Sequence, residues 1–395
     1  MFGVLCRVTF VMDIPISRIV EDMAPSGIRA FFDLVLGMKD VISLGVGEPD
    51  FITPWRIREK AISSLEQGYT SYTSNKGMIE LRREIVHFLK RRYGFGYDPE
   101  AEVLITVGVS EGLDLAMRAI LNPGDKVLVP EPAYVSYGPV VELAGGQPIY
   151  LRTDVKNGFK LTAPQIDKAC GRGVKALLIN YPANPTGASY RRNELRDIVK
   201  VILKRNLLVI SDEIYDELTY DFDHIPLASF KGMKDRVIYL NGFSKAYAMT
   251  GFRLGWAAGH PEIIAAMTKI HQYTMLCASI TAQMAALEAL KSGFKDVQEM
   301  KREYKRRRRF VVASLNEMGL DCHEPQGAFY VFPSIKNTGL KSLDFAKNLL
   351  KKKKVALVPG VAFGPSAERY VRISYASSYE NLREAMNRLR LFLGR

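Results

Sequence analysis

The chain has 395 residues, of which 47% are hydrophobic and 25% charged, as in an ordinary soluble globular protein. This length allows two domains with separate cores, and no apolar stretch approaches the roughly 18 residues that a membrane-spanning helix needs. A formal net charge of +13 could serve nucleic-acid binding, but no nucleic-acid-binding motif accompanies it. We therefore expect neither a membrane nor a nucleic acid as a partner.

Much of the positive charge lies in two short runs, KREYKRRRRF (301–310) and KKKK (351–354). Both runs lie in or beside patterns of apolar residues at helical spacing. Charged runs in that setting are usually solvated faces of helices. We therefore predict that these side chains are exposed to solvent.

Residues 1–11, MFGVLCRVTFV, are apolar but lack the basic segment and the small-residue cleavage site of a signal peptide. We interpret them as an upstream start or a short tail, and we expect a cytoplasmic protein. The four cysteines are far apart in the sequence, and the five histidines show no metal-ligand spacing. Buried free thiols are therefore expected, with neither a disulfide framework nor a metal site.

From about Trp55 onward, helical patterns alternate with short apolar runs rich in Leu and β-branched residues. Such runs are typical of parallel strands buried on both faces of a sheet. The alternation predicts an α/β doubly wound domain with a largely parallel sheet. The clearest runs are VLITVG (103–108), KVLVPEP (126–132), KALLINYP (175–182), LLVISDE (207–213) and RVIYLNGFS (236–244).

After about residue 292 the pattern changes to a long charged helix, followed by short strands and further helices. This is an α+β arrangement, so we expect a second, smaller domain at residues 291–395. We place the large domain at residues 53–290 and expect residues 12–52 to pack with the small domain. Residues 1–11 are expected to lie outside both domains.

Chemically informative residues follow several of the strands, at the edge where open α/β sheets bind ligands. The stretch GVSEG (108–112) is a glycine loop that leads into a helical pattern, and the free N–H groups of a helix start can hold phosphate. Asn184, in the turn ANPTG, offers an amide to a ligand. Asp212 ends an otherwise apolar strand, where a carboxylate is costly unless it meets a cation.

Lys245 lies in the run NGFSKAYAMTGFRLGW (241–256), where no other charge follows it until Arg253. A lysine held among such apolar and aromatic residues is costly to bury, and burial lowers its pKa. A lysine that deprotonates more easily is a nucleophile toward carbonyl groups. Taken alone, Lys245 could equally be a snorkelling lysine at the end of a strand.

One cofactor accounts for this whole set of side chains. Pyridoxal phosphate (PLP) has an aldehyde that forms an imine with a lysine, and its phosphate suits a helix start and an arginine. Its phenolic oxygen suits Asn and Tyr donors, and its ring nitrogen stays protonated when a carboxylate faces it. We therefore expect Lys245, Asp212, Asn184 and Arg253 to surround PLP.

The motifs of the chain resemble, in their order, those of the class I and II aminotransferases of PLP fold type I, especially the prokaryotic aspartate and aromatic aminotransferase subgroup. The resemblance extends from about residue 28 to residue 391. It implies a large domain with a mostly parallel seven-stranded sheet between helices, and a smaller α+β domain. The motifs are SLGVGEPDF, SYTSNKGMIELR, YPANPTG, SDEIYDELTY, SKAYAMTGFRLGW, GAFYVFP and YVRISYA.

The resemblance also implies roles for individual residues. Lys245 is implied as the catalytic residue that binds the PLP aldehyde, and Asp212 as the partner of the ring nitrogen. The substrate α-carboxylate is expected at Arg372, close to Gly45 and Asn184. The other implied cofactor contacts are Asn184 and Tyr215 at the phenolic oxygen, Tyr134 stacked on the ring, and Val109, Ser110, Ser244 and Arg253 at the phosphate.

Tyr72, in SYTSNKG, matches a tyrosine that reaches the phosphate of the neighbouring subunit, so the resemblance implies a homodimer with shared active sites. The implied activity is the exchange of an amino group between an L-amino acid and a 2-oxo acid such as 2-oxoglutarate, in two stages through PLP and pyridoxamine phosphate. A carbon–sulfur β-lyase of the same fold is the nearest alternative. A PLP-fold transcriptional regulator is a more distant one, since the N-terminal residues carry no helix-turn-helix pattern.

An aromatic or other large amino donor is favoured, with aspartate still open, because an acidic side chain needs a second cation in the site. Some relatives that favour aspartate place a lysine where this sequence has Ser110, and the adjacent Glu111 has the wrong sign. Phe31, Tyr69 and Tyr134 are candidates for the lining of an apolar pocket.

Overall fold

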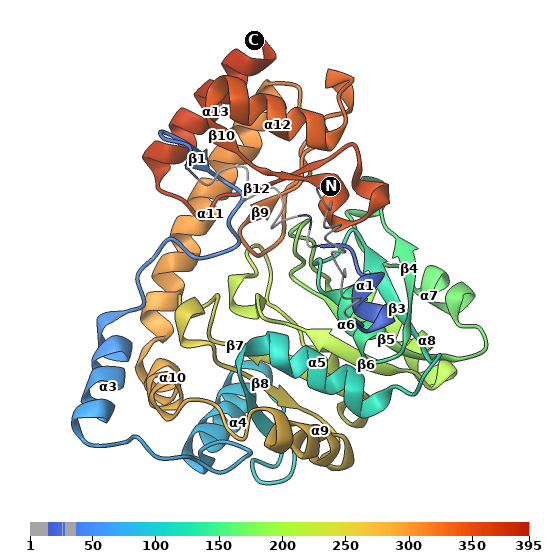
Figure 1. The fold of residues 1–395 in the computed structure, drawn as a ribbon, viewed down its shortest axis with the longest axis vertical. Coiled ribbons are helices and arrows are strands. Elements are labelled where there is room, and N and C mark those ends of the chain that lie inside the picture. Colours follow the sequence, from blue (N-terminus) through green and yellow to red (C-terminus); the bar gives the residue numbers. More distant parts are fainter. Residues whose placement is uncertain (1–14, 26, 28–36, 395) are drawn as a thin grey trace, which may run out of the picture.

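The computed structural model describes residues 15–25, 27 and 37–394, so the predictions on residues 1–11 and Phe31 lie outside it. Figure 1 shows a broad sheet with its helices in the lower part of the molecule and a smaller group of helices and short strands above. The long helix α11 (Phe294–Glu317) runs along one side and joins the two parts.

The larger part is built on a seven-stranded sheet with the strand order β2-β8-β7-β6-β5-β3-β4. Neighbouring strands pair in parallel except at β8, which runs antiparallel to both β2 and β7. The predicted α/β fold with a mostly parallel sheet is therefore confirmed. The strands are β2 (Val103–Thr106), β3 (Lys126–Glu131), β4 (Gln147–Arg152), β5 (Val174–Asn180), β6 (Leu208–Asp212), β7 (Val237–Gly242) and β8 (Gly255–Ala258).

Both faces of this sheet are covered by helices, because its strands carry apolar side chains on both sides. In β7, Ile238 and Leu240 join one hydrophobic core, whereas Val237 and Tyr239 join the core on the opposite face. This alternation follows the two-residue period of a strand. The first core includes α5 (Gly108–Ile120), α6 (Tyr137–Leu143) and α9 (Pro261–Thr274), and the second includes α3 (Trp55–Glu66), α4 (Ile79–Tyr93), α7 (Ala163–Ala169), α8 (Arg192–Arg205) and α10 (Ile280–Ser292).

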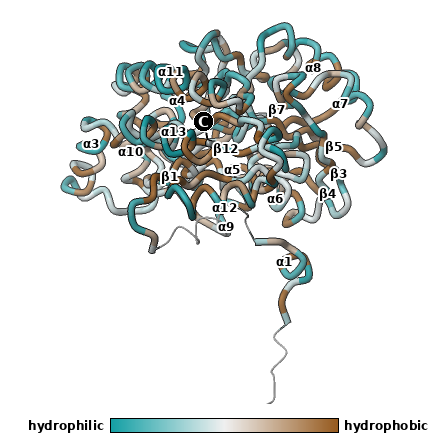
Figure 2. Tube along the Cα trace, turned by 90° about the horizontal axis from the view of Figure 1, so that it is seen from above, coloured by the Kyte–Doolittle hydropathy of each residue, from teal (hydrophilic) through white to brown (hydrophobic). Residues whose placement is uncertain are grey.

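The smaller part combines segments from both ends of the chain. Strand β1 (Ile42–Ser43) pairs in parallel with β10 (Val355–Ala356), and a second, antiparallel sheet has the order β11-β12-β9. Figure 2 shows apolar residues concentrated toward the middle of the molecule, while the short helix α1 (Arg18–Glu21) projects from the body. The remaining elements are β9 (Tyr330–Val331), β11 (Val358–Pro359), β12 (Val371–Ser374), α12 (Ser342–Lys353) and α13 (Tyr379–Leu393).

The five apolar runs quoted from the sequence contain five of the strands, and β4 and β8 are absent from them. Strand β4 lies at the edge of the sheet and has no fully buried residue, so it carries no continuous apolar run. Strand β8 has four residues, three of which are glycine or alanine. The predicted glycine loop at 108–112 is instead helical, because α5 begins at Gly108.

The prediction that the basic runs are solvated is wrong for two residues of the first run. Arg307 and Arg308 on α11 are buried, because carboxylates from distant parts of the chain neutralise them. Arg307 pairs with Asp50 at 2.8 Å, and Arg308 pairs with Asp221 at 2.7 Å. The second run, 351–354, is exposed or half-buried.

Two smaller predictions can be compared with the structure. Cys170, Cys277 and Cys322 are free thiols, as predicted, but they are half-buried rather than fully buried, and Cys6 lies outside the described residues. Within the described ranges, no helix is long and apolar enough to cross a membrane.

Candidate active site

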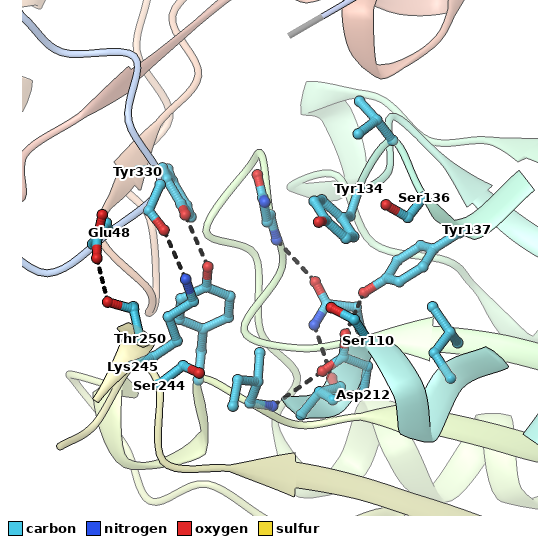
Figure 3. Close-up of a pocket in the computed structure, with 18 of the residues that line it drawn as sticks. Glu48, Ser110, Tyr134, Ser136, Tyr137, Asp212, Ser244, Lys245, Thr250 and Tyr330 are labelled. Carbon is cyan, nitrogen blue, oxygen red and sulfur yellow. Dashed lines mark hydrogen bonds between the residues drawn. The ribbon is translucent and has the colours of Figure 1, made fainter. Parts of the chain in front are cut away.

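A cavity of about 560 Å³ lies at the carboxyl ends of the central strands β5, β6 and β7. Its lining comes from both parts of the molecule, because residues 45–48, Tyr330 and Arg372 belong to segments that lead into or form the smaller part. In Figure 3, Lys245 and Tyr330 lie on the left and Asp212 on the right. The cavity therefore lies where the sequence predicts ligand binding in an open α/β sheet.

Lys245 follows β7 and presents its amine to the cavity. Strand β7 ends at Gly242, and the lysine side chain is only half-buried because it faces this space. The Nζ atom donates a hydrogen bond of 2.7 Å to the carbonyl oxygen of Gly47 (Figure 3). The amine is thus held by a backbone carbonyl and has no carboxylate hydrogen-bonded to it within the described part of the chain.

Burial lowers the pKa of the Lys245 amine to about 8. The positive charges of Arg372 and Arg253 lower this pKa further, whereas Glu48 and Asp212 oppose the shift. A free amine is therefore more accessible near neutral pH than in an ordinary lysine.

Asp212 ends β6 and is a buried carboxylate at the floor of the cavity. Its Oδ2 atom accepts a hydrogen bond of 2.7 Å from the Tyr137 hydroxyl, and Oδ1 accepts one of 3.2 Å from the Ile214 N–H. Burial raises the pKa of Asp212 to about 6, although both hydrogen bonds oppose the rise. Both of these donors to the Asp212 carboxylate are neutral groups, so it can still accept a cationic group from a ligand.

Arg372 on β12 lies at the opposite end of the cavity and is buried. Its guanidinium donates to the side-chain oxygen of Asn184 at 2.9 Å and to the carbonyl of Gly45. The rings of Tyr330 and Phe363 lie 4.5 and 5.0 Å from it. Within the described ranges Arg372 has no carboxylate partner and its Nε atom has no acceptor, so the guanidinium can receive a carboxylate.

The start of α5 forms a third part of the cavity wall. Gly108, the first helical residue, has a φ of +72°, and a Cβ atom there would lie 2.9 Å from the guanidinium of Arg253. A Cβ atom at Gly255 would lie 2.6 Å from the N atom of Val109, so glycine allows β8 to pass this close. Helix-start N–H groups and an arginine together suit an anion. The hydroxyl-bearing residues beside them are Ser110 and Ser244.

Aromatic residues form the walls between these polar ends. The hydroxyls of Tyr215 and Tyr330 are hydrogen-bonded at 2.8 Å (Figure 3). Tyr134 contacts Tyr137 edge to face, with ring centroids 5.6 Å apart. A flat ligand would therefore meet aromatic rings and hydroxyl groups along the length of the cavity.

The cavity brings together eleven of the twelve residues to which the resemblance assigns a role. Tyr72 lies apart from the cavity and its side chain is 82% exposed. Tyr69, a candidate for an apolar lining, is also outside the cavity, because it lies on an exposed turn after α3. The predicted residues that line the cavity are Gly45, Val109, Ser110, Tyr134, Asn184, Asp212, Tyr215, Ser244, Lys245, Arg253 and Arg372.

Several further residues of the cavity wall were given no role from the sequence, among them Tyr137, Asn180, Tyr330 and Gly47. Tyr137, which donates to Asp212, lies three residues after the predicted Tyr134 and begins α6. Asn180 ends β5 and donates to the backbone oxygen of Asp212 at 2.8 Å, which strand-end position alone could have indicated. Tyr330 and Gly47 lie within the quoted motifs GAFYVFP and SLGVGEPDF, but their contacts with Tyr215 and Lys245 are long-range and have no local signal.

Comparisons with known proteins agree with this geometry. The model of the family "Aminotransferase class I and II" matches residues 39–389. The chain is 53% identical to "Putative aminotransferase YugH" of Bacillus subtilis (strain 168), over 96% of this chain and 98% of that protein. It is 47% identical to an aspartate aminotransferase of Pyrococcus abyssi, over 92% of this chain and 95% of the other.

A solved structure shows the same fold. The chain superposes on an aromatic aminotransferase from Pyrococcus horikoshii OT3 with a TM-score of 0.88 and 44% identity, covering 93% of this chain and 98% of the other. Family match, sequence identity and structural similarity each cover nearly the whole chain. The chain therefore belongs to the class I and II aminotransferases.

Proposed function

We propose that this aminotransferase uses PLP to exchange an amino group between an L-amino acid and a 2-oxo acid such as 2-oxoglutarate. One observation supports this most strongly. A single cavity contains an amine with a lowered pKa, Lys245, and a buried carboxylate that lacks a cationic partner among the described residues, Asp212. These are the two groups that the aldehyde and the ring nitrogen of PLP require.

The remaining lining residues fit the other groups of PLP. The α5 start, Arg253 and two serines form a seat for the phosphate dianion. Asn184 and Tyr215 offer side-chain donors toward the phenolic oxygen, and Tyr134 offers a ring face. When bound, PLP supplies an aldehyde that condenses with amines and a protonated ring that withdraws electrons from the substrate α-carbon.

In this proposal Lys245 moves the proton of the chemical step. Its amine, with a pKa of about 8, would take the proton from the α-carbon of the substrate as the general base, and the resulting ammonium would hold that proton for its return. Asp212 holds a proton on the ring nitrogen, since a charged carboxylate at this buried position is most stable beside a cation. Tyr137 and the Ile214 N–H fix the direction of that carboxylate.

Arg372 binds and orients the substrate α-carboxylate in this proposal. A guanidinium presents paired N–H donors that match a carboxylate, and that of Arg372 has an unused Nε donor. Asn184 and the Gly45 carbonyl hold the guanidinium in place. The substrate α-carbon is thereby fixed within the cavity that also contains Lys245.

An aromatic or other large amino donor remains our proposal for the substrate, with aspartate as the competing donor. The cationic side chains that line the described cavity are Lys245, Arg253 and Arg372, and each already has a proposed partner. Glu48 contributes a negative charge to the same wall. A named relative acts on aspartate and another on aromatic substrates, so the relatives' names alone do not decide between them.

The assembly proposed from the resemblance is a cytoplasmic homodimer whose sites are shared through Tyr72. The high exposure of Tyr72 in the single chain supports a contact with a second copy. We also retain the proposed division into a large domain at 53–290 and a small domain at 291–395 with 12–52. The pairing of β1 with β10 supports the assignment of residues 42 and 43 to the small domain.

The test of the proposed function uses Lys245→Ala. Wild-type protein reconstituted with PLP should form a borohydride-reducible bond and convert an amino acid and 2-oxoglutarate into glutamate. The alanine variant should still bind PLP noncovalently, but it should lose the reducible bond and nearly all turnover. A cofactor label that survives borohydride reduction in the variant would contradict the role of Lys245, and pyruvate with ammonia formed without an amino acceptor would indicate a β-lyase instead.

A further inference from the structure

Glu111 on α5 has no role in the proposed function, although it follows Ser110 directly at the phosphate end of the cavity. Its side chain is only 8% exposed. A buried carboxylate beside a phosphate site has the wrong charge for binding that phosphate, and like charges close together are unfavourable. The hydrogen bonds of its two oxygen atoms indicate a structural role for this carboxylate.

Glu111 does not line the cavity, and both of its oxygens take part in hydrogen bonds. Oε2 accepts from the backbone N–H of Val107, the residue that precedes the helix, at 2.5 Å. Oε1 lies 2.6 Å from Nδ1 of His271, a fully buried residue on α9. The other His271 nitrogen, Nε2, has no partner among the described residues, so the ring is held through Nδ1.

These hydrogen bonds fix the turn between β2 and α5 through a residue that does not line the cavity. The hydroxyl of Thr106 adds a hydrogen bond of 2.8 Å to the carbonyl of Gly108. Glu111 thereby accepts from the N–H of Val107, which precedes the helix, and leaves the N–H groups of the first helical turn without an intrahelical acceptor. Through His271 the turn is also anchored to α9, which packs against α5.

We propose that Glu111 and His271 are a positioning pair that keeps the turn at 106–111 in its phosphate-binding conformation and so retains the cofactor during turnover. This inference rests on the proposed function. In a two-stage exchange the cofactor passes through pyridoxamine phosphate, which has no covalent bond to Lys245. At that stage only noncovalent contacts hold it, and the phosphate seat at α5 is a principal one.

A positioning role and a purely electrostatic role predict opposite effects of removing the carboxylate. If Glu111 acts mainly as a negative charge near the phosphate, Glu111→Ala should tighten binding of pyridoxamine phosphate. If it positions the turn, the same change should weaken binding roughly ten- to one-hundredfold, as expected for the loss of hydrogen bonds to a buried charged group. The sign of the change therefore separates the two roles.

The experiment measures the Kd of pyridoxamine phosphate by equilibrium dialysis for wild type, Glu111→Ala, Glu111→Gln and His271→Gln. The glutamine at position 111 keeps an acceptor for the Val107 N–H, so it should weaken binding less than alanine does. Glu262→Ala is the matched control, because Glu262 is an exposed acidic residue on the same α9 helix as His271. We expect this control to bind as wild type does.

A second measurement distinguishes positioning from a general loss of stability. After incubation with amino donor alone and gel filtration, Glu111→Ala should lose its cofactor and wild type should keep it, while the Tm of the two apoenzymes is recorded. A lower apoenzyme Tm with an unchanged or smaller Kd would overturn the inference. Failure of wild type itself to bind PLP or pyridoxamine phosphate would instead overturn the proposed function.

Discussion

Lys245 and Asp212 are both displaced toward their neutral forms, and burial is the main cause for each. The pKa of the lysine falls to about 8, and that of the aspartate rises to about 6. The Asp212 carboxylate accepts from neutral donors and the Lys245 amine donates to a backbone carbonyl, so neither hydrogen-bonded partner carries the opposite charge that would restore the usual pKa. Both pKa shifts suit a single ligand that has an electrophilic carbonyl group and a basic ring nitrogen. The neutral amine would attack the carbonyl group, and the carboxylate would pair with the protonated nitrogen.

The choice of amino donor depends on single residues in the cavity wall. Because the described lining offers no unassigned cation and includes Glu48, an acidic side chain should bind less well than an aromatic one. We expect kcat/KM for phenylalanine or tyrosine to exceed that for aspartate at saturating 2-oxoglutarate. A tenfold preference for aspartate, about 1.4 kcal/mol in the transition state, would contradict this expectation and would point to a cation from a second subunit.

Strand β8 shows how one reversed element completes the site. Because β8 runs antiparallel, its first residue, Gly255, pairs with Thr106 at the end of β2 and with Gly242 at the end of β7. Arg253, two residues earlier, therefore enters the sheet at the carboxyl edge. An additional parallel strand would have placed that arginine at the opposite edge, away from α5.

The close passage of β8 beneath α5 can be tested with Gly255→Ala. The new Cβ would meet the backbone of Gly108 and Val109 at 2.7 and 2.6 Å, so the helix start must move. We expect a loss of about 1–3 kcal/mol in the free energy of unfolding, measured by urea denaturation, together with weaker PLP binding. Gly251→Ala is the matched control, because a Cβ there meets nothing within 4 Å, and an equal loss in both variants would contradict the argument.

The elements and residues that the sequence predicts well are marked by a pattern in the residues next to them in the chain. Asp212 and Lys245 stand out because polar groups directly follow apolar runs, and strand ends in a parallel sheet converge on one edge. The family resemblance adds residues with weak local signals, such as Gly45 and Arg372. Together these account for half of the residues that line the cavity.

The features that could not be predicted depend on partners far away in the sequence. The sequence predicts a solvated Arg307 because its ion-pair partner, Asp50, lies 257 positions away and no neighbouring residue indicates the pair. The hydrogen bond from Lys245 to Gly47 likewise joins residues 198 positions apart. Such contacts arise only when the two parts of the molecule pack together, and a single sequence does not encode them in a local pattern.

At the scale of the whole molecule, Tyr72 is exposed on the surface and does not line the cavity of its own chain. Nearby, the Asn75 side chain donates a hydrogen bond of 2.7 Å to the carbonyl of Leu276. The large side chains of Tyr72 and Tyr273 are 82% and 84% exposed. A surface of this kind is consistent with burial against a second copy.

Hybrid dimers test whether the active sites are shared. When Lys245→Ala chains exchange with Tyr72→Phe chains, each hybrid should contain one site with both residues intact and one site with neither. Activity should therefore rise above that of either parent alone. If mass spectrometry shows subunit exchange and activity stays at the parental level, Tyr72 acts within its own chain.

The pairing of the chain's two ends sets an order in which the protein can assemble on the ribosome. Arg372 is 327 positions after its partner Gly45, so at 5–20 residues per second the two are synthesised roughly 15 to 65 s apart. Strand β1 likewise has no β10 to pair with until residue 355 has been made. The nascent chain can thus form the sheet that carries Asp212 and Lys245 well before the end of the cavity that contains Arg372 exists.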